Sequence, residues 1–168
     1  HRTKGKRETM NDENNVRQGT AVETVALDDL HADYAEIYLT GALGASPCES
    51  VWTDDDRLMC QESMFEMRGI YKANGYRATD WRQRADDHLV VQLLYVAAVA
   101  RCASSREDWT GLARVLDQHL LRWLPRFATC VVLRSGSSFY AGLALLTEEW
   151  SSTLRDNIAV LTGEARPA

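Results

Sequence analysis

Asp86, Asp87 and His88 stand together immediately before the most apolar stretch of the sequence, Leu89 to Ala100. Two carboxylates beside an imidazole could perform general acid–base catalysis or bind a metal ion if further groups lay nearby in space. The same residues also suit the first turn of a helix, where carboxylates complement the helix dipole and cap free amides. Binding of a cationic or amide-rich partner at the mouth of that helix is a third role. The local sequence leaves all three roles open.

No catalytic motif accompanies this acidic cluster. The sequence contains no Gly-x-Ser-x-Gly, His-Glu-x-x-His, phosphate-binding loop or dinucleotide fingerprint. Its four cysteines are scattered without a Cys-x-x-Cys pair, so we expect small buried hydrophobes rather than zinc ligands or disulfides. The sequence therefore predicts no catalytic residue, no metal site, no cofactor and no enzymatic activity. A small hydrolase that depends on His88 and Asp87 stays open as an alternative.

Aromatic side chains form a second group that could bind a ligand. The group consists of Tyr34, Tyr38, Trp52, Tyr71 and Trp81. Helical spacing favours core packing for the three tyrosines. Trp52 lies in an irregular connection after the segment "SPCES", and a tryptophan in such a place more often lines a groove or clamps a loop.

Apolar residues at three- and four-residue steps predict the helices that must position these groups. Helices are expected over residues 22–42, from about 53 to 75, from about 86, from about 106, and from about 138 to 161. The acidic run at 54–56 would start the second helix. Pro125 would interrupt or re-aim the fourth, leaving a short segment that ends at Gly136. The helix after Asp86 is apolar nearly all round and should be buried on every side.

The pattern as a whole predicts an all-α single-domain bundle of about six helices. Only three prolines and ten glycines punctuate the 168 residues, which disfavours a sandwich or barrel with its frequent turns. Residues 1–20 contain too few apolar groups to pack and are expected to form a flexible tail. The helical domain would span residues 21–163, followed by a short C-terminal tail over residues 164–168.

The charge and hydropathy of the chain restrict its partners and its location. A net charge of −5 disfavours nucleic acid as a partner and suits a basic one. The longest apolar run is shorter than the roughly 20 residues that span a bilayer. The basic N-terminus has no apolar segment behind it that would make a secretory signal. We therefore expect a cytoplasmic protein without stable membrane insertion.

Several short motifs, taken in order, resemble the TorD/DmsD/NarJ family of cytoplasmic chaperones for molybdenum-containing respiratory enzymes. The motifs are "DYAEIYL" (33–39), "SPCESVW" (46–52), "MRGIYKANG" (67–75), "DDHL" (86–89), "HLLRWLPRF" (119–127) and "FYAGLALL" (139–146). None is specific alone, but the ordered series covers nearly all of the predicted helical domain. The resemblance implies a TorD-like all-α fold with a hinge near the Asp-Asp-His segment. It also implies a partner: the twin-arginine signal peptide and apoprotein of a molybdopterin oxidoreductase, held back from export until its cofactor is inserted.

The resemblance further implies which residues bind the signal peptide. The family's Asp-His pair, which is linked to signal-peptide recognition, matches Asp87 and His88. The other matching positions are Tyr34, Ile37 and Tyr38 of the first motif, and Pro47, Glu49, Ser50 and Val51 of the second. Trp52 joins the predicted binding residues as a candidate groove wall. The family's His-Leu-x-x-Trp segment after the hinge matches His119, Leu120 and Trp123, and we assign Asp86 with them as a hinge or structural residue.

Three departures from the family pattern accompany these matches. Ala85 and Asp86 replace a proline-bearing approach to the Asp-His pair, and Cys48 replaces the large aromatic residue of some members. Less helical sequence precedes the first motif than in most members. The N-terminal part would then be absent or supplied by another subunit, so a monomer and a domain-exchanged dimer are both expected states.

A twin-arginine signal joins two guanidinium groups to an apolar segment, which calls for carboxylates beside a hydrophobic groove. We hypothesise that Asp87 and His88 form the polar end of such a groove. Because a protonated histidine repels guanidinium groups, a His88 that titrates near neutrality would weaken binding as the pH falls. A helical adaptor or structural subunit without a chaperone role is the other alternative.

Overall fold

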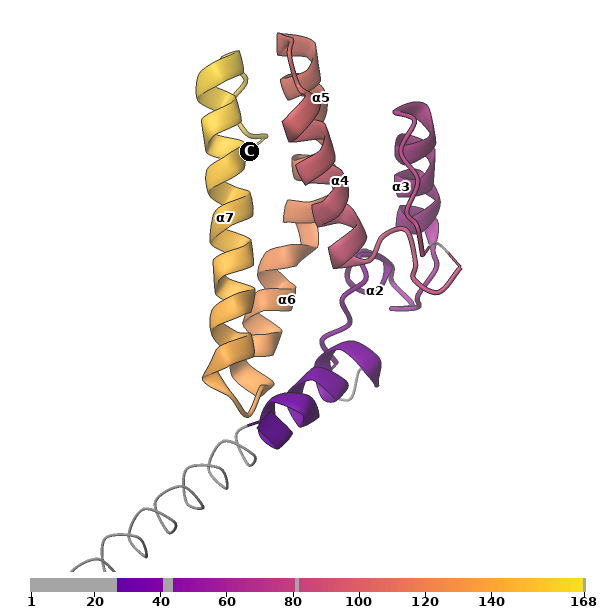
Figure 1. Ribbon diagram of the computed structural model, residues 1–168, viewed down its shortest axis with the longest axis vertical. Helices are drawn as coiled ribbons and strands as arrows, with labels where there is room; N and C mark the ends of the chain where they lie inside the picture. The colour runs from indigo at the N-terminus through magenta and orange to yellow at the C-terminus, as the bar shows by residue number, and fades with distance from the viewer. Residues whose placement is uncertain (1–26, 41–43, 81, 168) are drawn as a thin grey trace, which may run out of the picture.

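The computed structural model describes residues 27–40, 44–80 and 82–167, and its regular structure is helical (Figure 1). Residues 27–34 form a helix that leads into the first of two π-helical segments. The elements in chain order are η1 (Ala35–Leu39), α2 (Ser50–Thr53), α3 (Glu62–Ala73), α4 (Leu89–Cys102), α5 (Arg106–Val115), η2 (Leu116–Leu120), α6 (Leu121–Arg134) and α7 (Ser138–Thr162). Within the described ranges, the one β pairing is an isolated antiparallel bridge between Cys48 and His88. The predicted all-α single-domain bundle is confirmed.

Some predictions concern residues outside these ranges. The flexible tail over residues 1–20 and Trp81 lie outside the described residues. The first helix, predicted over residues 22–42, is described only over residues 27–40, where it is helical as far as Leu39.

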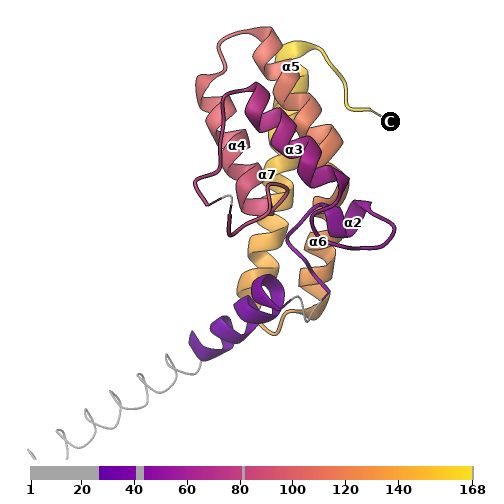
Figure 2. The ribbon, with the colours of Figure 1, turned by 90° about the vertical axis from the view of Figure 1, so that its right-hand side faces the viewer.

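The main core lies along α5, η2 and α6, with α7 packed against α6 and α5 (Figures 1 and 2). Its largest members are at most 1% exposed: Leu112, Leu116, Leu120, Trp123, Leu124, Phe127, Val131 and Ile158. Burial of each such side chain stabilises the fold by roughly 1.5–3 kcal/mol. This apolar strip therefore fixes the helices that carry His119 and Trp123.

Helix α3 stands away from α6 and α7 and joins the bundle through a smaller core (Figure 1). Met67 and Tyr71 of α3 pack with Val91 and Tyr95 of α4. The ring centroids of Tyr71 and Tyr95 lie 4.9 Å apart, a distance at which aromatic pairs attract each other. The contact with α4 thus positions α3 in the bundle.

The second long helix begins at Glu62, and the prediction that the acidic run at 54–56 starts it is wrong. The run forms a turn instead, in which the Asp56 backbone N–H donates to Asp54 Oδ1 at 3.0 Å. Aspartate side chains compete in this way with helical hydrogen bonds. Arg57 and Cys60 follow with φ angles of 53° and 62°, in the left-handed region that stops a helix.

The third helix begins at Leu89 rather than near Asp86, because His88 is its N-cap. His88 has extended dihedrals (φ −70°, ψ 139°), and its Nδ1 accepts a hydrogen bond from the Val90 backbone N–H at 3.1 Å. An N-cap residue is non-helical, so the two aspartates before it lie outside the helix.

Pro125 does not interrupt its helix, which was one of the two effects predicted for it, because it lies inside the continuous helix α6. The irregularity falls earlier, in η2, where the Leu121 backbone N–H donates to the Leu116 carbonyl in the wide π pattern. Pro125 is the fifth residue of α6 and follows closely on this π-helical segment. The π-helical segment η2 contains His119, one of the predicted hinge or structural residues.

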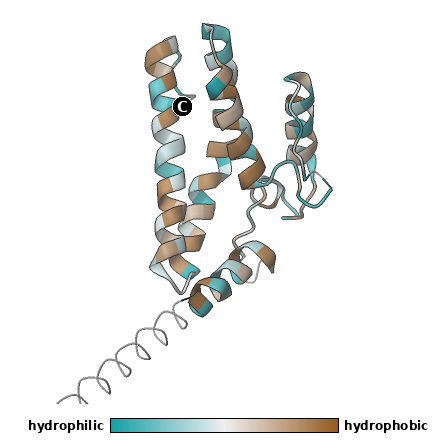
Figure 3. Cartoon of the chain, in the orientation of Figure 1, coloured by the Kyte–Doolittle hydropathy of each residue, from teal (hydrophilic) through white to brown (hydrophobic). Residues whose placement is uncertain are grey.

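Helix α4 is not buried on every side, which corrects the prediction. Val90 is 39% and Leu94 56% exposed, and on α7 Leu146 and Trp150 are exposed as well. Figure 3 shows apolar residues along both helices. The cysteine prediction also fails in part. The thiols are free and Cys48 is buried, but Cys60 and Cys102 are exposed.

Among the described residues, no helix is both long and apolar enough to cross a bilayer.

Candidate functional site

Asp87 is completely buried and joins two segments that are distant in sequence. Its Oδ2 accepts hydrogen bonds from the backbone N–H of Ser50, at 2.8 Å, and from the Ser50 hydroxyl. Backbone bonds run alongside, from Glu49 N–H to the Asp87 carbonyl at 3.2 Å and from Leu89 N–H to the Pro47 carbonyl at 2.8 Å. The carboxylate therefore holds the Pro–Glu–Ser loop against the start of α4.

The other carboxylate oxygen of Asp87, Oδ1, is buried and has no hydrogen-bond partner among the described residues. A buried, unsatisfied acceptor costs about 1–3 kcal/mol, so such groups are uncommon in folded proteins. Neither oxygen reaches the surface. In this conformation Asp87 positions the loop and does not present its charge to a ligand.

Asp86 anchors α3 rather than forming part of an open site. Its Oδ2 accepts a charge-assisted hydrogen bond from Arg68 Nε at 2.6 Å. The Tyr71 hydroxyl donates to the Asp86 backbone carbonyl at 2.9 Å. Burial, together with the nearby charge of Asp86, raises the pKa of Tyr71 far above its usual value. The phenol therefore stays protonated and remains a donor.

His88 has a titration range that differs from the one expected. Burial lowers the pKa of His88 to about 4, and the nearby charge of Arg84 lowers it further than the charge of Asp80 raises it. The imidazole is therefore neutral near pH 7, and the expected charge change near neutrality is wrong. Its partner is the Val90 backbone N–H.

A second buried carboxylate, Glu49, is the centre of a polar network inside the bundle. Glu49 Oε2 accepts from Gln92 Nε2 at 2.6 Å, and His119 Nδ1 lies 3.1 Å from Glu49 Oε1. The Trp123 indole N–H donates to Gln92 Oε1 at 3.4 Å. Glu49 and Trp123 are completely buried and His119 is 4% exposed. Among the described residues, the histidine in contact with a carboxylate is thus His119, and its partner is Glu49.

A groove of about 970 Å³ lies between the N-terminal helical segment, the Pro–Glu–Ser loop and the first turns of α4 and α7. Six of the predicted binding residues line it: Tyr34, Ile37, Tyr38, Pro47, Val51 and His88. Four do not line it: Asp87, Glu49 and Ser50 are completely buried, and Trp52 packs against α6. The predicted set therefore divides into a groove wall and its support.

Trp52 clamps the loop, which is one of the two roles expected for it. Its indole N–H donates to the Ser46 carbonyl at 2.8 Å. The Arg126 guanidinium donates to the Trp52 carbonyl at 2.7 Å and lies 5.5 Å from the centre of its ring. Its ring also meets Phe127 edge-on, with centroids 6.4 Å apart. These contacts fix the loop to α6.

The groove has an aromatic end that sequence reasoning found only in part. Tyr34 and Tyr38 have ring centroids 5.2 Å apart, and Tyr140 of α7 lies 6.4 Å and 6.0 Å from them. Phe139 and Leu143 of α7 line the same groove. The segment "FYAGLALL" had indicated a family resemblance but no binding role. Its contribution depends on α7 packing beside η1, which no local pattern shows.

The charges along the groove differ from the expected acidic rim. The charged wall residues are Arg57, Asp80 and Arg84, and Asp80 is already paired with Arg84 at 3.4 Å. Most of the remaining wall is apolar or aromatic. Such a surface is suited to hold an apolar segment.

Asp33 fixes the N-terminal wall of the groove. Its two carboxylate oxygens accept hydrogen bonds from the backbone N–H groups of Gly136, at 2.9 Å, and Ser137, at 2.7 Å, at the start of α7. Burial opposes ionisation, but these hydrogen bonds outweigh it and hold the pKa of Asp33 below its usual value. The π-helical turn η1 then carries Ile37 and Tyr38 into the groove.

A comparison with known families places the chain. Residues 9–129 match the family model described as nitrate reductase delta subunit. Because this match covers more than half of the sequence, the chain belongs to that family. The predicted membership of the TorD/NarJ-type group of maturation chaperones is thereby confirmed.

Curated relatives carry the name chaperone protein TorD. The protein from Vibrio cholerae serotype O1 (strain O395) is 30% identical over 126 residues, which cover 70% of this chain and 57% of the relative. The protein from Shewanella piezotolerans is 30% identical over 148 residues, covering 83% and 66%. The chain thus spans less than two thirds of the length of these relatives. They are named as chaperones and not as enzymes, in agreement with the prediction that this chain is not an enzyme.

Proposed function

We propose that this chain acts as a cytoplasmic, system-specific chaperone of a molybdenum-containing oxidoreductase. It binds the twin-arginine signal peptide and the apoprotein, prevents premature export and assists cofactor insertion. The relatives named chaperone protein TorD support the class of function. The observation that carries the peptide-binding part is the groove with its aromatic end at Tyr34, Tyr38 and Tyr140.

The apolar segment of the signal peptide occupies the groove. Leu89, Leu93 and Leu143 offer it aliphatic surface between the loop and the two helices. Removal of apolar surface from water contributes about 25 cal/mol per Å², less the cost of ordering a flexible peptide. A groove of about 970 Å³ accommodates several side chains, so this term dominates the affinity.

The two arginines of the signal bind at the aromatic end. Tyr34 is 45% exposed, and guanidinium groups stack favourably on tyrosine faces. Asp80 is the carboxylate among the described wall residues and can exchange its partner Arg84 for an arginine of the peptide. The net charge of −5 attracts a basic peptide at longer range. Asp87 contributes indirectly, by holding the loop.

Titration calorimetry with synthetic peptides tests this proposal. A twin-arginine signal peptide should bind, a peptide with polar replacements in its apolar segment should bind much more weakly, and a peptide with both arginines changed to glutamine should fall between them. Absence of binding by any twin-arginine peptide would refute the proposal.

Co-purification from the native host separates the chaperone from the adaptor alternative. A chaperone should bring down an oxidoreductase precursor that still carries its signal peptide. An adaptor or structural subunit should bring down the mature enzyme instead. Recovery of mature enzyme alone would favour the adaptor.

A further inference from the structure

The groove wall contains one arginine whose side chain has no partner among the described residues. Arg57 lines the groove from the turn between α2 and α3, and it is exposed. Its guanidinium group makes no hydrogen bond or ion pair to any described residue. The other charged wall residues, Asp80 and Arg84, pair with each other at 3.4 Å. Arg57 therefore gives the described part of the groove wall an unbalanced positive charge.

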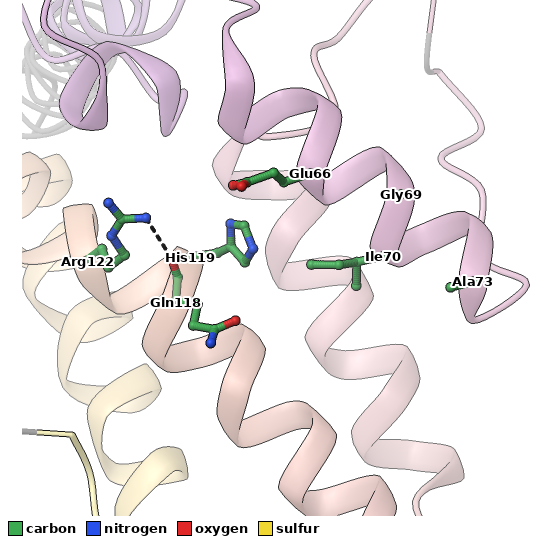
Figure 4. A pocket seen from close by; sticks show the side chains of 7 residues that line it. All are labelled: Glu66, Gly69, Ile70, Ala73, Gln118, His119 and Arg122. Atoms are coloured by element: carbon green, nitrogen blue, oxygen red, sulfur yellow. Dashed lines mark hydrogen bonds between the residues drawn. The ribbon is translucent and has the colours of Figure 1, made fainter.

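An arginine in each of two neighbouring cavities is engaged by the protein itself. Arg122 lines the cavity between α3 and η2, and it donates to the Gln118 carbonyl of its own turn at 3.2 Å (Figure 4). Arg68 lines a cavity at the end of α3 and pairs with Asp86 at 2.6 Å. Arg57 differs from both, because all five of its guanidinium N–H donors are left for water or a ligand.

The turn between α2 and α3 fixes the backbone of Arg57 at the groove. Arg57 has a φ angle of 53°, in the left-handed region that side chains other than glycine seldom adopt. Its backbone N–H donates to the Asp54 carbonyl at 3.2 Å, and the Gln61 backbone N–H donates to Ser50 Oγ at 3.3 Å. Ser50 is itself held by Asp87, so the turn is tied to the loop that forms the groove wall. Strained backbone of this kind is concentrated at functional sites.

The acidic residues of the same turn do not balance Arg57 within the groove. Asp54, Asp55 and Asp56 precede it in the sequence, but none of them lines the groove. Asp54 Oδ1 accepts from the Asp56 backbone N–H instead. A ligand in the groove therefore meets the guanidinium group of the turn and not its carboxylates.

An unbalanced cation in the groove opposes the two arginines of a signal peptide. Like charges repel, and in 0.1 M salt this repulsion is screened beyond about 10 Å. The aromatic end of the groove includes Tyr140 of α7. In Figure 1, α7 lies on one side of the molecule and α3, with the turn that leads into it, on the other. Repulsion by Arg57 thus favours the peptide direction that places the arginines at the aromatic end and the opposite end of the apolar segment at Arg57.

A carboxylate is the side chain that Arg57 is best suited to bind. Guanidinium and carboxylate groups form short, charge-assisted hydrogen bonds, and two parallel bonds make the pairing geometrically specific. Met59 of the same turn also lines the groove and is 55% exposed. Its flexible apolar side chain can pack beside the end of the apolar segment while Arg57 pairs with the residue that follows.

We propose that Arg57 is a specificity-determining residue, which selects signal peptides that carry an acidic side chain just beyond the apolar segment. This inference rests on the proposed function and adds a charge pattern to the peptide that the groove binds. The arginines bind at the aromatic end, the apolar segment occupies the groove, and the carboxylate pairs with Arg57. Twin-arginine peptides without the acidic residue bind more weakly, which restricts the chaperone to its own oxidoreductase.

Titration calorimetry with designed peptides tests this inference. Each peptide contains two arginines, an apolar segment of leucine and alanine, and a short stretch of serines after it. In three matched series, aspartate, asparagine or lysine replaces each serine in turn. At one position of the stretch, wild type should bind the aspartate peptide about tenfold more tightly than the asparagine peptide, and the lysine peptide most weakly.

Two substitutions and a control assign this preference to one side chain. Arg57→Gln should bind the aspartate and asparagine peptides equally, and Arg57→Glu should favour lysine over asparagine. Arg101→Glu is the matched control, because Arg101 is an exposed arginine of α4 that does not line the groove. It changes the net charge by the same amount as Arg57→Glu and should keep the preference for aspartate.

The inference is overturned if wild type binds the aspartate and asparagine peptides equally at every position, or if Arg57→Gln keeps the preference for aspartate. Either result leaves the proposed function standing, because the peptides still bind. The wild-type comparison uses no substitution, so it does not depend on the folding of a variant. If wild type binds no twin-arginine peptide, the proposed function fails and this inference fails with it.

Discussion

Ser50 donates two hydrogen bonds to a single oxygen of Asp87, one from its backbone N–H at 2.8 Å and one from its hydroxyl. The aspartate of the Asp-His pair is therefore occupied within the protein, 37 residues along the chain from its partner. The relationship makes the Pro–Glu–Ser loop and the start of α4 one rigid unit. This unit forms one wall of the groove, and its Glu49 side chain contacts His119.

Removal of the Asp87 carboxylate should lower stability before it lowers affinity. Asp87→Ala leaves the Ser50 amide without its partner in a buried position, and hydrogen bonds to charged groups are worth roughly 1.5–3 kcal/mol each. We expect a loss of about 2 kcal/mol in the free energy of unfolding, measured by urea denaturation. Ser50→Ala, which removes only the hydroxyl, should lose less. Unchanged stability with abolished peptide binding would contradict the positioning role.

His88 should leave signal-peptide binding insensitive to pH near neutrality. Its folded-state pKa of about 4 lies below the ordinary value of 6.5, so the unfolded chain takes up the proton first. The stability contribution is present above about pH 6.5 and is lost as the pH falls towards 4. The free energy of unfolding should therefore fall more between pH 7 and pH 5 in wild type than in His88→Gln. Equal slopes would refute the lowered pKa.

Asp33→Ala should loosen the N-terminal wall of the groove. The variant loses two hydrogen bonds from the backbone N–H groups that precede α7, and a hydrogen bond to a charged group is worth roughly 1.5–3 kcal/mol. Because the pKa of Asp33 is lowered, its contribution should also disappear in wild type as the pH falls below 3.8. Asp29→Ala is the control, an exposed aspartate on the same helix. Identical melting temperatures for the two variants would argue against this contact.

Tyr140→Ala should reduce signal-peptide affinity by about tenfold, since it removes one face of the aromatic end that stacks an arginine. Phe65→Ala provides the comparison, because Phe65 is an aromatic residue that is 58% exposed on α3 and does not line the groove. Calorimetry should show a loss for the first variant alone. If Tyr140→Ala and wild type bind the peptide with the same affinity, the aromatic end is excluded as the binding site of the arginines.

Thiol labelling should distinguish the cysteines in the native protein. Burial raises the pKa of Cys48 to about 12, with a further contribution from Asp87, so Cys48 should react with iodoacetamide only after unfolding. Cys60 and Cys102 are exposed and should be labelled rapidly at pH 8. Mass spectrometry of peptides from briefly labelled protein measures this order. Rapid native labelling of Cys48 would mean that the loop opens frequently.

Local patterns were sufficient for some elements of the fold. The capping box of Ser105 and Asp108 begins α5 at Arg106, where the apolar periodicity had indicated a start. Local patterns were insufficient where one residue type favours two different structures. The run at 54–56 reads as a helix start, but its aspartates bond within a turn. Pro125 reads as a break, but it lies inside the continuous helix α6.

The candidate site divides in the same way. Tyr34, Ile37, Tyr38, Pro47 and His88 were identified from motifs and line the groove. The motifs do not show which face of the loop a residue occupies, so Asp87 and Glu49 were assigned to binding although their side chains are buried. Phe139 and Tyr140 gave no local signal of their role, because they reach the groove only when α7 packs beside η1.

The sequence by itself determined that this protein is helical, acidic and a member of its family, because helix periodicity, charge and motif order are properties of the chain taken locally. Only the tertiary structure decided which carboxylates are buried and which side chains share a cavity. Glu49 and His119 are 70 residues apart, yet their contact depends on how the loop meets η2. Tertiary packing brings such side chains together, and no periodicity in the sequence encodes their contact.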